Sequence, residues 1–164
     1  MKISNSQLQN KAKALSMFFE SMKMLKEEGI LVNKKDFTCQ IGEWLVETIY
    51  DGKRAESGIQ KGWDVDVKGK HIQVKTHAKK EGNNNRWSRV EKDSTEVIDS
   101  LVIVVFTHDY KLKEFYDVPW TDAQPMINMR GNKIKKPEIN WSQLSDFRVD
   151  ISKLPRQEVI QLFI

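Results

Sequence analysis

The chain has 164 residues, of which 39% are hydrophobic and 30% charged, with a net charge of +4 and a single cysteine, Cys39. This length fits one domain over residues 1–164, and a lone cysteine excludes an internal disulfide and a cysteine-rich zinc site. No apolar run approaches the ~20 residues of a membrane helix, and the start lacks the apolar stretch of a signal peptide. We therefore expect a cytoplasmic protein that does not enter a membrane.

Two amphipathic helices are predicted at about residues 6–50. Over residues 6–28, apolar side chains recur at helical spacing after a serine cap, and Gly29 ends the run. A stripe of this kind is typical of core packing, and we assign it no function. The second helix is predicted over residues 38–50, with Glu43 on a different face from its apolar stripe.

A β-hairpin is predicted over residues 63–77, where two alternating runs flank a turn. Because alternate side chains of a strand point to opposite faces, the polar residues of both runs share one face. A turn at Lys68-Gly69 pairs Asp64 with Gln73, and a turn at Gly69-Lys70 pairs Asp64 with Lys75. Both registers gather the same polar set on one face: Asp64, Asp66, Gln73 and Lys75.

The hairpin belongs to a core sheet predicted over about residues 53–118. A short extended piece precedes the hairpin, residues 100–107 are typical of a strand buried on both faces, and residues 113–118 pair back as an outer strand ended by Pro119. In the C-terminal extension, 119–164, Thr121 is predicted to cap a short helix. Residues 155–163 are predicted to form a terminal helix with Pro155 in its first turn.

The positive charge is concentrated around the hairpin. Residues 52–80 carry eight basic and three acidic residues, whereas the remainder carries nineteen basic and twenty acidic residues. An excess of positive charge beside an acidic pair suits a site that attracts a phosphate backbone and places a metal ion next to it. A solvated lysine-rich hairpin is the alternative interpretation of the charge pattern.

The polar face carries groups that phosphodiester hydrolysis needs: oxygen ligands for a cation and a group that positions water. Asp64 supplies a carboxylate, while the Gln73 side chain and the Val74 main chain supply neutral carbonyl oxygens. This ligand set is consistent with Mg²⁺, which takes few protein ligands and retains several waters, with Mn²⁺ as the alternative. Lys75 is suited to orienting the attacking water and contacting a phosphate oxygen.

These residues resemble the PD-(D/E)xK nuclease superfamily, in which a helical Glu precedes a strand with a metal-binding Asp and a strand with (D/E)-x-K. Here Glu43, Asp64 and the Gln-Val-Lys run at Gln73–Lys75 match that order over about residues 38–107. The resemblance implies an α/β (α+β) restriction-endonuclease-like fold with a central mixed sheet of about five strands flanked by helices. It also implies a metal-dependent deoxyribonuclease with Glu43, Asp64, Gln73 and Lys75 as catalytic residues, and with Glu43 joining Asp64, Gln73 and Val74 around the metal.

Gln73 departs from the family pattern, because an acidic residue usually stands there. Losing a carboxylate should weaken metal affinity, and Asp66 on the same face is a candidate to compensate. Two alternatives to an active nuclease therefore stay open. One is a catalytically silent nucleic-acid-binding module of the same fold, and the other is a structural or protein-binding α/β domain.

DNA is the expected partner, and a homodimer would supply two centres to cut both strands. The basic residues that follow the catalytic strand are expected to contact phosphate, and Trp87 among them is expected either to stack on a base or to pack against the domain. A second basic stretch at residues 129–136 has the same two interpretations, DNA contact or exposed loop. The assigned nucleic-acid contacts are Lys61, His77, Lys79, Lys80, Arg86 and Arg89.

Overall fold

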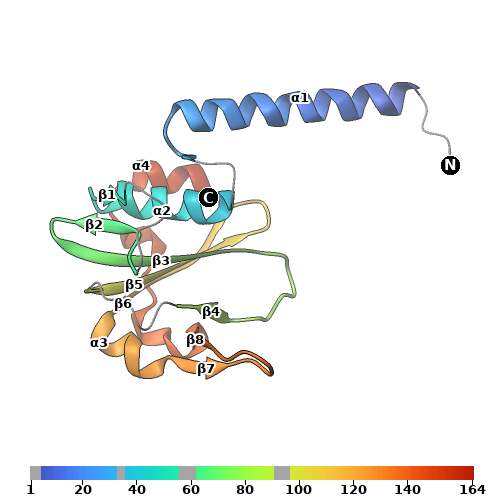
Figure 1. Cartoon of the computed structure of the whole chain (residues 1–164). Coiled ribbons are helices and arrows are strands. Elements are labelled where there is room, and N and C mark those ends of the chain that lie inside the picture. The colour runs from blue at the N-terminus through green and yellow to red at the C-terminus, as the bar shows by residue number, and fades with distance from the viewer. Residues whose placement is uncertain (1–4, 33–35, 56–61, 91–96) are drawn as a thin grey trace.

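A five-stranded mixed sheet forms the centre of the molecule (Figure 1). The computed structural model describes residues 5–32, 36–55, 62–90 and 97–164. The strand order is β1-β2-β3-β5-β6, in which β3 and β5 run parallel and the other neighbours are antiparallel. Helices flank this sheet, which confirms the expected α+β class. The strands are β1 (Lys53–Arg54), β2 (Val65–Val67), β3 (Lys70–Lys79), β5 (Ser100–Thr107) and β6 (Leu112–Pro119).

The β2–β3 hairpin adopts the first of the two predicted registers. Val67 pairs with Lys70 and Val65 with Ile72, so the two-residue turn is Lys68-Gly69. Both turn residues have positive φ, 55° and 85°, as the type I′ turn requires and as Gly69 adopts without strain. The same register places Asp64 opposite Gln73.

One face of the sheet is covered by α2 (Phe37–Ile49) and α4 (Gln157–Ile160). Asp36 caps α2 by accepting a hydrogen bond from the Cys39 backbone N–H at 3.3 Å. The apolar stripe of α2 packs on alternate residues of β3 and β5. The buried residues of this layer include Leu45, Val46, Ile49, Ile72, Val74, Val102, Val104 and Phe106.

The opposite face is covered by a second sheet and a short helix. The second sheet has the order β4-β8-β7, with β4 at Trp87–Arg89, β7 at Asn128–Arg130 and β8 at Lys136–Asn140. The helix α3 spans Trp120–Ala123, and 3₁₀ turns occupy Gln124–Met126, Trp141–Gln143, Ser145–Phe147, Ile151–Lys153 and Gln161–Phe163. Side chains of β5 are buried on both sides of the sheet, which confirms the prediction for residues 100–107.

Two predictions for the C-terminal extension need correction. Thr121 lies inside α3 rather than at its cap, because Pro119 holds the capping position without a side-chain hydrogen bond. The terminal helix is also shorter than predicted, since α4 begins at Gln157 and a 3₁₀ turn follows it. Pro155 precedes the helix because Arg156, with φ of 57°, is its N-cap.

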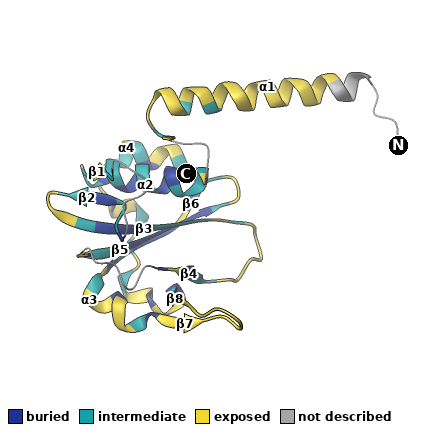
Figure 2. Ribbon diagram, in the orientation of Figure 1, coloured by how far each residue is buried: buried dark blue, intermediate teal, exposed yellow. Residues whose placement is uncertain are grey.

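The first helix, α1 (Asn5–Glu27), lies where the sequence predicts, but its packing was predicted wrongly. Over residues 9–27, no side chain of α1 is buried, and the helix extends away from the rest of the fold (Figures 1 and 2). Its apolar stripe is therefore not part of the core of this chain. Within the described residues, no helix is both long enough and apolar enough to cross a membrane.

Candidate metal centre

The candidate site lies where β2 ends beside β3. Strand pairing reaches only Val65 and Ile72, whereas β3 continues to Lys79. Beyond this point the Asp64 side chain takes the place of a partner strand, because its Oδ2 accepts a 2.7 Å hydrogen bond from the Val74 backbone N–H. The N–H and C=O of one strand residue point to the same edge, so the Val74 carbonyl also lies on the side of Asp64.

Asp64 is held in a largely buried position. Its backbone N–H donates to the Ile72 carbonyl at 2.8 Å, and its own carbonyl accepts from the Ala55 N–H at 2.9 Å. Burial raises the pKa of Asp64, while the Lys75 charge and the Val74 N–H act in the opposite direction. Hydrogen bonds to both its main chain and its side chain therefore fix the Asp64 carboxylate near the positive charge of Lys75.

Gln73 is the most deeply buried member of the set, with 1% of its surface exposed. Its Nε2 donates a 2.8 Å hydrogen bond to the Gly62 carbonyl, in the segment just before Asp64. That bond fixes the amide orientation, so Oε1 is the atom by which Gln73 would bind a metal ion. A carboxylate at this position would turn an acceptor toward the Gly62 carbonyl, which explains why an amide suits this backbone.

Glu43 comes to the site from α2, which approaches β3 closely. A Cβ placed on Gly42 would lie 1.9 Å from Thr76 Oγ1, so only glycine permits this contact. Burial raises the pKa of Glu43 to about 7, the Asp64 charge adds to that effect, and the charges of Arg54 and Lys75 oppose it. The Glu43 carboxyl is therefore within the electrostatic influence of the Asp64 carboxyl.

Lys75 is half-buried on β3, two residues beyond Gln73. Its charge opposes the rise that burial causes in the pKa values of both Asp64 and Glu43. The helix residue and the two strand residues predicted from the sequence thus interact electrostatically, although 32 positions separate Glu43 from Lys75 in the chain.

Asp66 turns away from this group. Its Oδ1 accepts a 2.9 Å hydrogen bond from the Gly69 N–H, and its Oδ2 lies 3.6 Å from His71 Nε2. Asp66 therefore stabilises the hairpin turn, and it does not replace the carboxylate that Gln73 lacks. The His71 ring is stacked on Trp63 with ring centres 4.4 Å apart, and it too is part of the hairpin.

The candidate ligands predicted from the sequence are two carboxylates, one amide oxygen and one main-chain carbonyl. Among the residues that the structure describes, no cluster of three or more His, Cys, Asp or Glu side chains is arranged to hold a metal. Mg²⁺ is commonly bound by one or two carboxylates and keeps several waters, so this smaller set fits it. Cys39 lies nearby, and burial raises the pKa of its thiol to about 12, which keeps it protonated.

The predicted phosphate contacts fall into two groups. His77 and Lys79 surround the buried Trp141: the His77 ring lies 4.5 Å from the Trp141 ring, and Lys79 Nζ lies 4.5 Å above it. His77 Nε2 also lies 2.5 Å from Ser88 Oγ, and burial lowers the pKa of His77 to about 4. A neutral, packed His77 contributes no charge to phosphate binding at neutral pH.

Arg86 forms a two-pronged ion pair with the buried Glu114, at 2.6 and 3.1 Å, and donates to the Tyr116 hydroxyl at 2.7 Å. Tyr116 in turn donates to Glu114 at 2.6 Å. The Arg86 side-chain hydrogen bond is the largest influence that lowers the pKa of Glu114, to about 2. Arg86, which immediately precedes β4, is therefore linked to β6, and its charge is already balanced by Glu114.

Glu114→Gln should lower the free energy of unfolding by about 1–2 kcal/mol at pH 7, because the ion pair with Arg86 is lost and one of the two carboxylate acceptors becomes an amide donor. The folded pKa is below the ordinary value, so the stabilisation is present above pH 4.5 and is lost as pH falls toward 2. Urea unfolding at pH 7 and at pH 3 measures both effects. Equal losses at the two pH values would contradict this account of the ion pair.

The remaining predicted contacts are available at the surface. Lys80 and Arg89 are exposed, and so are Arg130 and the lysines of the β7–β8 hairpin. The Arg130 guanidinium lies 3.7 Å from the centre of the Trp87 ring, so Trp87 is partly covered by a cation from the second basic stretch. Lys61 lies outside the described residues.

Sequence reasoning missed Gly62 and Glu114. Gly62 acts through its carbonyl, which leaves no trace in residue type, and Glu114 resembles any acidic residue on an outer strand. The predicted outer strand at residues 113–118 contains Glu114, but its partner Arg86 lies 28 positions away. No model of a known protein family and no curated protein matches this chain.

Proposed function

We propose that this protein is a Mg²⁺-dependent endonuclease that hydrolyses phosphodiester bonds of DNA, with a PD-(D/E)xK centre of the Gln-x-Lys type. The observation that carries the proposal is the bond from the Val74 N–H to Asp64 at the open edge of β3, beside Lys75 and within the electrostatic reach of Glu43. Mn²⁺ fits the same ligands. The single cysteine supports a cytoplasmic location.

Asp64, Gln73 Oε1, the Val74 carbonyl and Glu43 would hold the cation, which when bound supplies positive charge to stabilise the developing negative charge on phosphate. The raised pKa of Glu43 favours this role, because two interacting carboxyl groups in a buried site gain from a shared cation. Gly62 positions Gln73 through the Nε2 hydrogen bond.

Lys75 would orient the attacking water and contact a phosphate oxygen. It lies on the same strand face as Gln73, and its positive charge reaches both acidic groups. The exposed cations Lys80 and Arg89 would contact the DNA backbone, since neither is engaged in the Trp141 and Glu114 clusters described above.

Cleavage of supercoiled plasmid DNA in Mg²⁺ tests the proposal. The parent protein should nick or linearise the plasmid, and both Asp64→Ala and Lys75→Ala should reduce the rate by about 100-fold or more. Asp66→Ala is the matched control, since it removes a carboxylate from the same hairpin but from the turn instead of the site. Equal cutting by all four proteins would show that the assigned centre is wrong.

A binding module without catalysis is the second candidate, and the Gln73 amide favours it, because it leaves two carboxylates, Glu43 and Asp64, among the candidate ligands. This function predicts salt-sensitive DNA binding that persists in Asp64→Ala. Substituting both Lys80 and Arg89 with alanine should then reduce the salt dependence. Absence of plasmid cleavage together with such binding would favour this candidate over the nuclease.

A further inference from the structure

Helix α1 presents large apolar side chains to solvent. Most of the described part of α1 is exposed (Figure 2). Leu15, Phe18 and Phe19 are 55%, 50% and 61% exposed, and Met22 and Leu25 are only half-buried. Contiguous apolar surface of this kind marks an interaction site in proteins, whereas isolated exposed apolar residues do not. The face of α1 therefore needs a partner.

The spacing of this face indicates what the partner is. Positions 11, 15, 18, 22 and 25 alternate in steps of four and three, and all but Lys11 are apolar: Leu15, Phe18, Met22 and Leu25. Steps of four and three give the 3.5-residue repeat by which one helix packs its side chains between those of another helix. Phe19 and Ala12 widen this seam on one side.

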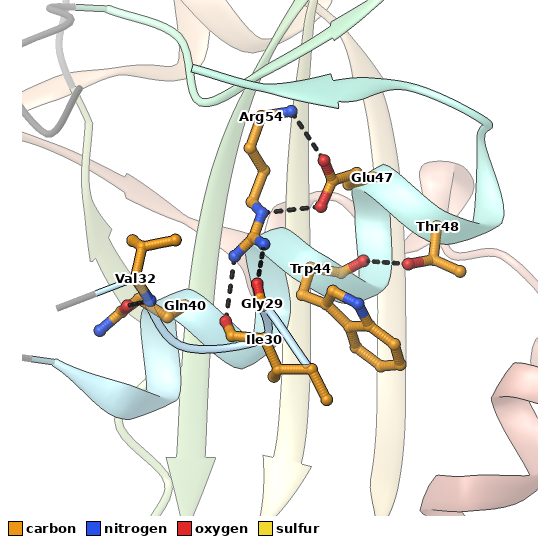
Figure 3. Close-up of polar contacts among 8 residues, drawn as sticks. All are labelled: Gly29, Ile30, Val32, Gln40, Trp44, Glu47, Thr48 and Arg54. Atoms are coloured by element: carbon orange, nitrogen blue, oxygen red, sulfur yellow. Dashed lines mark hydrogen bonds and ion pairs between the residues drawn. The ribbon is translucent and has the colours of Figure 1, made fainter. Parts of the chain in front are cut away.

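The helix is also fixed at its base. The Arg54 guanidinium donates to the carbonyls of Gly29 and Ile30 just after α1, and its Nε donates to Glu47 Oε2 on α2 at 2.7 Å (Figure 3). The Val32 N–H donates to Gln40 Oε1 at 2.7 Å in the same region. These bonds hold the start of the domain against the end of α1, so the seam is presented in a defined direction.

We propose that α1 pairs with α1 of a second copy of this chain, forming a homodimer through the seam 15–18–22–25. A two-fold dimer places the same surface of both copies in contact, and a seam of this period is complementary to itself. Elsewhere among the described residues, the exposed large apolar side chains are Val32, Val97, Met129, Ile134, Leu162 and Ile164. None of those positions offers a comparable seam for α1.

The charges of α1 indicate that its partner is another helix and not a lipid surface. Outside the seam positions 15, 18, 22 and 25, α1 carries both signs of charge, with four lysines and two glutamates between Asn5 and Glu27, and Lys23 lies 3.7 Å from Glu27 in an ion pair. Helices that lie on membranes usually have a strongly basic polar face and a wide apolar face. A mixed surface around a narrow seam is typical of helices that pair in water.

The mass of the full chain in solution, measured by sedimentation equilibrium, tests the proposal. The parent should be a dimer. Leu15→Asp combined with Phe18→Asp should raise the dissociation constant of the dimer by at least about tenfold. The matched control is Met17→Asp combined with Met24→Asp, because these side chains are 58% and 64% exposed on the same helix but lie off the seam. The control should dimerise like the parent.

Circular dichroism and the melting temperature show that each variant is folded, as expected for substitutions at exposed positions. A monomeric parent, or equal dissociation constants for seam variant and control, would overturn the proposal. Flotation of the parent with vesicles of zwitterionic and anionic lipid, lost in the seam variant, would also overturn it. This test measures mass and not DNA cleavage, so its result does not depend on whether the protein is a nuclease.

Discussion

Gln73→Glu should make the stability of this protein depend strongly on pH and on Mg²⁺. The Gln73 amide is buried and donates to the Gly62 carbonyl. A protonated glutamic acid can replace that donor, but an ionised one cannot, and its charge would join Asp64 and Glu43. The pKa of the new carboxyl should therefore be raised, so the stability of the variant should fall as pH rises.

At pH 8 without metal we expect a loss of about 3 kcal/mol relative to the parent, and at pH 4.5 a much smaller loss. Mg²⁺ should restore part of the stability at pH 8, because the added carboxylate strengthens the ligand set. Thermal melting at both pH values, with and without Mg²⁺, measures this. Gln73→Met is the control, since it also removes the donor but adds no charge. A Gln73→Glu variant that melts alike with and without Mg²⁺ would contradict the assigned ligand set.

Glu43 should make the stability of the parent protein depend on pH. The folded pKa of about 7 lies above the ordinary value of 4.5, so the folded state holds the proton more tightly than the unfolded state. Stability should then fall as pH rises from 4.5 to 7, by roughly 1–3 kcal/mol after allowing for partial solvation. A bound divalent cation favours the ionised form, so Mg²⁺ should stabilise the protein more at pH 8 than at pH 5.5.

Glu43→Gln should reduce both the dependence of stability on pH and the dependence of the Mg²⁺ effect on pH, because the amide does not titrate while the Asp64 carboxyl remains. Urea unfolding across pH 5 to 8, with and without Mg²⁺, compares the two proteins. Glu47→Gln is a poor control because Glu47 pairs with Arg54, so Glu27→Gln on the exposed part of α1 serves instead. If parent and Glu43→Gln keep the same slope of stability against pH, Glu43 is not the titrating group.

The hairpin and the sheet could be predicted because their signals are local. Alternation over residues 63–77 and a two-residue turn at Lys68-Gly69 limit the strand register to very few choices, and the observed pairing of Val65 with Ile72 is one of them. The run at residues 100–107 likewise shows burial on both faces without knowledge of what covers it.

The packing of α1 could not be predicted in the same way. An apolar stripe such as Leu15 and Phe18 shows that a helix needs a partner, but the stripe alone does not show whether that partner is its own domain. The site shows the same limit. Alternation placed Asp66 and Asp64 on one face, yet the Gly69 N–H binds Asp66 and the Val74 N–H binds Asp64. These long-range and turn contacts separate two residues that look equivalent in the sequence.

Binding of Mn²⁺ to the metal-free protein tests most directly whether a metal centre lies at the open edge of β3. The electron paramagnetic resonance signal of the free ion measures how much Mn²⁺ is bound. The parent should bind Mn²⁺, Asp66→Ala should bind it equally well, and Asp64→Ala should bind it at least about tenfold more weakly. Equal binding by parent and Asp64→Ala, or no binding by the folded parent, would contradict a metal centre at the open edge of β3.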